Sequence, residues 1–231
     1  MRYIDAPLRK YYAARAREYE RIHTKPERQA DIAQLQLLLP GFFTGRRVLE
    51  VACGTGYWTS FLMQQAKSIV AVDFSTETLE VAGEKEWPRG RVTFRVADAY
   101  ALPEDLGTFD AAFAGFWWSH VPLRDRAAFL GSLDRRLRTG SKVLFLDNLF
   151  VEGSSTPIAH RDADGNTYQR RRLDDGSEHV VLKNFPSEAE LRAEVAPFGQ
   201  NVQFAALQYY WLLRYETRRA ERRQLPMSTV T

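Results

Sequence analysis

The sequence predicts an α/β protein in which a mostly parallel sheet carries helices on both faces. After Gly45, short apolar segments rich in Val, Phe and Leu alternate with helix-like stretches, and neighbouring parallel strands need such long crossover connections. A chain of 231 residues with 45% hydrophobic residues can build one sizeable core, whereas two full domains would each be cramped. We therefore expect one domain with additions.

Seven strands are expected in this sheet. The first five lie near Arg47–Ala52, Ser68–Asp73, Val92–Ala97, Phe109–Ala114 and Lys142–Asp147, and a final pair lies near Val202–Leu207 and Tyr209–Tyr215. After the fifth strand, Asp174-Asp175-Gly176 reads as a turn between strands at Tyr168–Leu173 and His179–Lys183. The sequence thus predicts an inserted β-hairpin at about 167–184.

The flanks complete the expected organisation. Spaced apolar residues predict helices over Leu8–His23 and Pro26–Leu39, which would form an N-terminal helical lid at 1–44. Pro186, Ser187 and Glu188 open a helix to about Val195. We expect the main domain at 45–216 and a charged C-terminal tail at 217–231.

Charge and composition restrict the class of protein. The net charge is +3, and the basic excess lies in local groups at 135–138, 170–172 and 214–223, which we interpret as solvated faces and a frayed tail. No basic and aromatic residues interleave along a nucleic-acid-binding motif, so no nucleic-acid partner is expected. No apolar run reaches the roughly 18 residues needed to span a bilayer, and the N-terminus is not signal-like. Together with the single cysteine, Cys53, this predicts a cytoplasmic protein without stable membrane insertion. A monomer or a homodimer is expected, and the sequence does not decide between them.

The segment from Val48 to Thr59 carries the first chemical signal, because an apolar strand is followed by a glycine turn and a helix start. Gly54 and Gly56 remove side chains where the backbone bends and approaches a ligand. A dinucleotide-binding loop would have a third glycine at the position of Thr59. This departure argues against a nicotinamide enzyme.

The same segment resembles the glycine-rich motif of class I S-adenosylmethionine (SAM)-dependent methyltransferases, with Glu50 as its acidic residue. Ala52 stands where that motif often has its first glycine, and related quinone C-methyltransferases tolerate alanine there. The resemblance covers about residues 45–150. It implies a Rossmann-like class I methyltransferase fold and SAM as the cofactor.

Further motif positions follow in order, and their roles are those that the resemblance implies. Asp73 ends the second strand, where a carboxylate accepts the ribose hydroxyl protons, and Phe74 packs on adenine. Asp98 accepts from the adenine amino group, and the backbone amide of Ala99 meets a ring nitrogen. Gly115 ends the fourth strand beside the transferred methyl.

Candidate acceptor-side residues lie just after the fourth strand and in the lid. His120 is the candidate general base, with a helix-entry or buried hydrogen-bonding histidine as the alternative. Trp117 and Trp118 are candidate walls of the acceptor site, with core packing as the alternative. Tyr11, Tyr12 and Tyr19 resemble the Tyr-rich lead segment that closes over the cofactor in many small-molecule methyltransferases, with an amphipathic helix that packs its rings on the sheet as the alternative.

A metal centre is not expected. Asp147-Asn148 resembles the metal-binding pair of catechol O-methyltransferases, but no acid follows the fourth strand to complete such a site. The nucleophile and base-binding motifs of DNA methyltransferases are also missing. We expect a metal-independent enzyme that methylates oxygen or nitrogen of a small aromatic or apolar acceptor. The alternatives are C-methylation of a quinone-like ring and a cofactor-binding member without methyl transfer.

Overall fold

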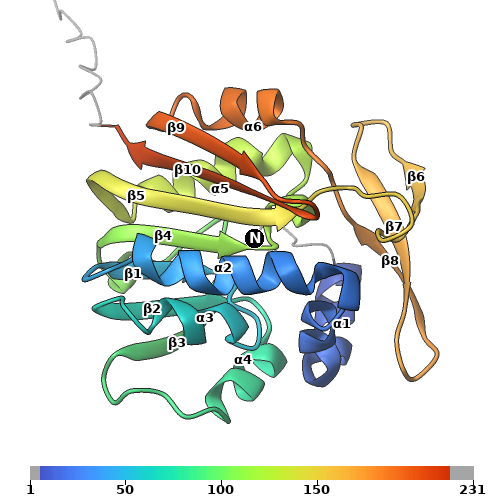
Figure 1. Cartoon of the computed structure of the whole chain (residues 1–231), viewed down its shortest axis with the longest axis horizontal. Helices are drawn as coiled ribbons and strands as arrows, with labels where there is room; N and C mark the ends of the chain where they lie inside the picture. Colours follow the sequence, from blue (N-terminus) through green and yellow to red (C-terminus); the bar gives the residue numbers. More distant parts are fainter. Residues whose placement is uncertain (1–5, 219–231) are drawn as a thin grey trace, which may run out of the picture.

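Seven strands form one mixed sheet in the computed structural model, which describes residues 6–218 (Figure 1). Their order is β3-β2-β1-β4-β5-β10-β9, with β10 antiparallel to both of its neighbours. The strands are β1 (Arg47–Val51), β2 (Ser68–Asp73), β3 (Val92–Val96), β4 (Phe109–Gly115), β5 (Leu137–Asn148), β9 (Gly199–Ala206) and β10 (Tyr210–Thr217). This confirms the predicted sheet.

Helices pack on both faces because strand residues alternate between two hydrophobic cores. In β5, Val143 and Phe145 enter one core, whereas Leu144 and Leu146 enter the other. The first core also takes residues of α5 (Arg126–Asp134) and α6 (Glu188–Val195), and the second takes residues of α2 (Gln29–Phe42) and α3 (Tyr57–Leu62). The helix α4 (Thr76–Gly83) follows β2. The helix α6 begins where the sequence predicts, and Ser187 caps it in a reciprocal capping box with Glu190.

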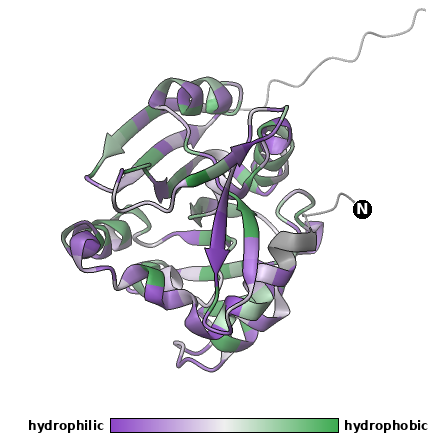
Figure 2. Cartoon of the chain, turned by 90° about the vertical axis from the view of Figure 1, so that its right-hand side faces the viewer, coloured by the Kyte–Doolittle hydropathy of each residue, from purple (hydrophilic) through white to green (hydrophobic). Residues whose placement is uncertain are grey.

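The insertion after β5 is larger than the predicted hairpin. A third strand, β6 (Ile158–Arg161), pairs with β7 (Thr167–Arg172), which pairs with β8 (Glu178–Leu182). The residues of β6 are all exposed, so the segment lacks the buried alternation that marks a strand in sequence. Figure 2 faces this small sheet and shows one strand that is hydrophilic along its length.

The N-terminal segment lies over the end of the main sheet, beside the small sheet (Figure 1). It consists of α1 (Ala6–Arg15), the 3₁₀ helices η1 (Ala16–His23) and η2 (Pro26–Arg28), and then α2. Residues 6–23 are called the lid below. Arg17 pairs with Glu84, and Lys85 pairs with Glu20, so the lid is joined to the end of α4.

The expected start of the C-terminal tail is corrected at Thr217. This residue is the last of β10 and is buried, and its hydroxyl donates to the backbone carbonyl of Arg138. Residues 219–231 of the expected tail lie outside the described residues. None of the described helices is long and apolar enough to cross a membrane.

The two faces of α2 allow a matched test of the core. Leu35 is fully buried against the sheet, whereas Leu37 is 82% exposed on the same helix. Leu35→Ala should lower the free energy of unfolding by about 2–5 kcal/mol through lost burial and a residual cavity. Leu37→Ala should change it by less than about 0.5 kcal/mol. Urea unfolding of both variants checks this, and equal losses would contradict the observed orientation of α2.

Candidate functional site

The turn after β1 has a left-handed backbone at three alternate residues. The φ angles are +55° at Ala52, +55° at Gly54 and +77° at Gly56. Glycine adopts this region without steric cost, whereas an alanine there costs roughly 1–2 kcal/mol. The conformation explains why a glycine is frequent at the position of Ala52 in the motif.

Asp73 holds this turn against the end of β2. Its carboxylate accepts from the backbone N–H of Gly54 at 2.8 Å and from that of Ser75 at 2.9 Å. Burial raises the pKa of Asp73, and these amide donors oppose the shift. The carboxylate therefore already organises the loop before any ligand is considered.

A cavity lies at the ends of β1, β2 and β4, and we call it the strand-end cavity. It brings together nine of the residues singled out in the sequence, namely Tyr12, Tyr19, Ala52, Gly54, Asp73, Phe74, Gly115, Trp117 and His120. Thr78 and Phe116 complete its lining. A Cβ atom added to Gly54 would lie 3.7 Å from the Tyr19 ring, so glycine keeps the space between the turn and the lid open.

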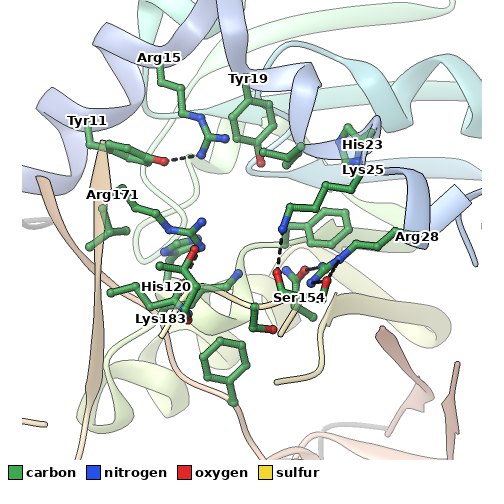
Figure 3. A pocket seen from close by; sticks show the side chains of 18 of the residues that line it. Tyr11, Arg15, Tyr19, His23, Lys25, Arg28, His120, Ser154, Arg171 and Lys183 are labelled. Carbon is green, nitrogen blue, oxygen red and sulfur yellow. Dashed lines mark hydrogen bonds between the residues drawn. The ribbon is translucent and has the colours of Figure 1, made fainter. Parts of the chain in front are cut away.

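A second cavity lies between the lid, the end of β5 and the small sheet, and we call it the cationic cavity (Figure 3). Five cationic side chains line it, namely Arg15, Lys25, Arg28, Arg171 and Lys183. It shares Tyr12, Tyr19, Phe116 and His120 with the strand-end cavity. The two cavities therefore meet at these four side chains.

His120 is held at this junction by both ring nitrogens. Nδ1 lies 2.6 Å from the Leu182 carbonyl oxygen, which can only accept, so we assign the ring proton to Nδ1. Nε2 then accepts from the Tyr12 hydroxyl at 2.8 Å. Burial, reinforced by Lys183, lowers the pKa of His120 to about 3. A neutral imidazole thus presents Nε2 where the two cavities meet.

A buried ion pair lies beneath this histidine. Lys183 Nζ lies 3.1 Å from Asp147 Oδ1 and donates to Ser119 Oγ at 2.6 Å, while the Ser119 N–H donates to Asp147 Oδ2 at 2.9 Å. Burial alone would favour the neutral forms of both Lys183 and Asp147. Each charged group is hydrogen-bonded to the other and to Ser119, as a stable buried ion pair requires. Burial acts to raise the pKa of Asp147, but Lys183, His120 and the backbone N–H donors of Ser119 and Asn148 together outweigh it, so this pKa lies below its usual value.

Four predicted cofactor residues do not line the strand-end cavity. Glu50 is 1% exposed and accepts from the Thr59 hydroxyl at 2.7 Å. Gly56 packs against Trp87, where an added Cβ would approach the ring to 3.0 Å. Asp98 accepts from the backbone N–H of Tyr100, and Ala99 is buried in the core. In this structure these residues support the turn and strand ends rather than the cavity wall.

The aromatic candidates divide in the same way. Trp117 lines the strand-end cavity, and Tyr11 lines the cationic cavity. Trp118 requires a correction, because it is 1% exposed, packs against Phe129 and Phe145, and lies on neither cavity. Trp117 and Trp118 both pack against Phe129 in the same core, but only Trp117 also lines a cavity.

The cationic residues are the part that sequence reasoning missed. The interpretation of the group 170–172 as a solvated face is correct for the exposed Arg170 and Arg172 but wrong for Arg171. Successive residues of β7 point to opposite faces, so only the middle arginine reaches the cavity. Arg171 lies two residues after Gln169 and therefore on the same face of β7, which is buried at Gln169. This period of two was the signal in the sequence that could have identified Arg171.

Comparison with known proteins places this geometry in a family. A family model described as "Methyltransferase domain" matches residues 48–140. A structure of DhpI in complex with SAH has a TM-score of 0.73 and 29% identity, over 92% of this chain and 96% of that one. The chain contains a class I SAM-dependent methyltransferase domain. A protein of Pyrococcus horikoshii OT3, at 20% identity and a TM-score of 0.68, shares its fold.

Similar sequences cover a smaller share of the chain. A demethylmenaquinone methyltransferase of Lactococcus lactis subsp. lactis (strain IL1403) is 31% identical over 112 residues, which is 46% of this chain and 44% of that protein. An O-methyltransferase of Pyrenophora dematioidea is 34% identical over 119 residues, or 50% of this chain and 44% of that protein. The chain thus spans less than half the length of these relatives.

Glu50 gives the methyltransferase domain a characteristic pH dependence. Burial raises the pKa of Glu50 to about 8. A carboxyl whose pKa is higher in the folded state stabilises the fold below its unfolded pKa of about 4.3, and this contribution disappears as the pH rises through about 8. Glu50→Gln, which is neutral and similar in shape, should therefore lose less thermal stability than the wild type between pH 5 and pH 9.

Thermal unfolding across this pH range measures the difference. Glu80→Gln, an exposed change on α4, is the control and should follow the wild type. Parallel curves for the wild type and Glu50→Gln would contradict a buried carboxyl with a raised pKa.

Proposed function

We propose that this protein transfers a methyl group from SAM to an oxygen or nitrogen atom of a small molecule bound in the cationic cavity. The observation that carries this proposal is the meeting of the two cavities at Tyr12, Tyr19, Phe116 and His120. Of the two cavities, only the strand-end cavity is lined by Gly54 and Asp73. It is the cofactor side, and the cationic cavity is the acceptor side.

The residues of the strand-end cavity fit SAM. The Asp73 carboxylate can accept from ribose hydroxyl groups, and the Phe74 ring offers a face to adenine. The missing side chain at Gly54 leaves room beside Tyr19. A further DhpI structure, a complex with SAM and HEP, is 29% identical to this chain with a TM-score of 0.71.

SAM supplies a methyl group on a cationic sulfur, and the carbon–sulfur bond breaks toward sulfur as the bond to the acceptor atom forms, which leaves SAH. The chain's own task is to hold the reactants in line and exclude water. The lid contributes Tyr12 and Tyr19 to the junction for this purpose. His120 Nε2 can take the proton of a hydroxyl or amine acceptor once the Tyr12 hydroxyl turns away.

Metal independence is part of the proposal. The carboxylate of Asp147 is paired with the ammonium of Lys183, which is the charge that a cation would otherwise supply. Among residues 6–218, no group of three His, Cys, Asp or Glu side chains could hold a metal ion.

C-methylation of a quinone-like ring is the second candidate, favoured by the demethylmenaquinone methyltransferases among the relatives. A screen of phenols, amines, thiols and quinones for uptake of labelled methyl, with mass analysis of the product, separates the two candidates. Cofactor binding without turnover of any acceptor would favour a member of the fold that does not transfer methyl groups.

Asp73→Ala tests the cofactor side. The variant loses the acceptor of the ribose hydroxyl groups, so SAM and SAH affinity should fall by about ten- to a hundredfold, or roughly 1.5–3 kcal/mol. Calorimetry measures this. Glu77→Gln is the control, because this exposed residue lies in the first turn of α4 and lines neither cavity. Unchanged affinity in folded Asp73→Ala would exclude the assignment.

His120→Ala tests the chemical step. If His120 is the base for a hydroxyl acceptor, turnover should fall by about a hundredfold with little change in SAM affinity. An ordinary histidine base makes the rate fall on the acid side through a pKa near neutrality. Here that fall should occur at a much lower pH, because burial lowers the pKa of His120 to about 3. The wild-type rate should therefore show no histidine titration between pH 5 and pH 8.

The matched control is His160→Ala, since His160 is exposed and stacks on Tyr168 in the small sheet. Full activity of His120→Ala would leave this histidine with a structural role and positioning as the main source of catalysis.

A further inference from the structure

The positive charge of the cationic cavity is not neutralised by acidic side chains among the described residues that line it. No Asp or Glu is among the described residues that line it, while Arg15, Lys25, Arg28, Arg171 and Lys183 all do. The net charge of the whole chain is only +3, so this is a local concentration of positive charge. Figure 3 shows these side chains around one opening, contributed by the lid, η2 and the small sheet.

Two of the five cations have carboxylate partners. Lys183 pairs with Asp147, and Lys25 lies 4.0 Å from Glu27. The three arginines have only neutral partners within residues 6–218. Arg28 donates to Ser154 Oγ and Asn148 Oδ1, Arg171 donates to Gln169 Oε1, and Arg15 donates to the Tyr11 hydroxyl.

This arrangement costs free energy in the absence of a ligand. Arg28 is 6% exposed and reaches the Glu27 carboxylate only through the Ser154 hydroxyl, and a buried charge without a directly paired counter-charge is unfavourable. Burial lowers the pKa of Arg171, and the neighbouring Arg15 and Arg28 lower it further. Guanidinium groups that repel one another in one cavity form a site for an anion.

We propose that the methyl acceptor is a small molecule with a carboxylate or phosphoryl group, and that Arg15, Arg28 and Arg171 bind this oxyanion. The inference rests on the proposed function, and it adds an anionic group to the expected aromatic or apolar acceptor. The aromatic walls remain available for the rest of the molecule. Planar guanidinium groups from three elements suit an oxyanion, whose oxygens accept from several directions.

The carboxylate of SAM itself does not account for the three arginines. The amino acid part of SAM carries an ammonium group beside its carboxylate, so it adds no net negative charge. None of the five cations lines the strand-end cavity, where the motif residues gather. The charge therefore serves the acceptor side.

The first experiment uses the full chain saturated with SAH. Inorganic phosphate and acetate are added separately, with sodium chloride at equal ionic strength as the reference, and thermal unfolding is followed. A bound anion stabilises the folded state by mass action. Both oxyanions should raise the unfolding temperature of the wild type above the chloride reference.

Arg171→Gln and Arg15→Gln supply the test of the site, and Arg172→Gln is the matched control, because it is exposed on the opposite face of β7. The first two variants should weaken the apparent oxyanion affinity about ten- to a hundredfold, as expected for a lost hydrogen bond to a charged group. They should unfold no earlier than the wild type without oxyanion, because one repelling charge is gone. Arg172→Gln should behave as the wild type.

The outcomes separate the inference from the proposed function. Equal oxyanion stabilisation in Arg171→Gln and the wild type would overturn the inference, as would early unfolding of that variant with the oxyanion effect retained. Loss of SAH affinity in Arg171→Gln would also overturn it, since the charge would then serve the cofactor. Failure of the wild type to bind SAH at all would instead overturn the proposed function.

A second experiment identifies the oxyanion. Acceptors are offered in matched sets that carry a carboxylate, a phosphoryl group or a neutral amide at the same position, and labelled methyl uptake is measured. Turnover at least tenfold faster for one of the anionic members supports the inference and names its source. Turnover of the neutral member at an equal or higher rate would overturn it.

Discussion

The buried pair of Lys183 and Asp147 connects the parts from which the candidate site is built. Asp147 is the last residue but one of β5 in the main sheet, whereas Lys183 follows β8 in the small sheet. The Asn184 N–H also donates to the Ser119 carbonyl, and Leu182 holds His120. Because the small sheet is fixed to the strand ends in this way, Arg171 and His120 border the same cavity.

The position of the lid depends on the side chains where the two cavities meet. Tyr12 reaches His120 from α1, and Tyr19 covers the glycine turn. The contacts of the lid at its outer side are exposed ion pairs, which contribute little to stability. The aromatic side chains packed at the junction therefore hold the lid in place over the two cavities.

The sheet and the strand-end cavity could be predicted from the sequence because their determinants are local. A buried strand, a glycine turn and a second strand that ends in a carboxylate follow one another along the chain. Gly54 and Asp73 are therefore recognisable in the sequence alone. The cationic cavity could not be predicted, since Arg15, Arg28 and Arg171 come from three separate segments. Only the fold brings them together, and the exposed β6 gave no periodic signal. Trp118 shows the same limit within one dipeptide, because two adjacent tryptophans pack in the same core and only Trp117 also lines a cavity.

The alternation along β7 has a consequence for how the chain tolerates changes in length. Arg170 and Arg172 point away from the cavity, so inserting or deleting one residue between Thr167 and Arg171 would reverse the faces of the strand. The altered strand would keep its three consecutive arginines and still present the wrong one. The turn at Asp174–Gly176 lies beyond Arg171 and is exposed, so extra residues there leave the register before it intact. Related chains that share this cavity should therefore vary in length at the turn and keep the spacing from Thr167 to Arg171.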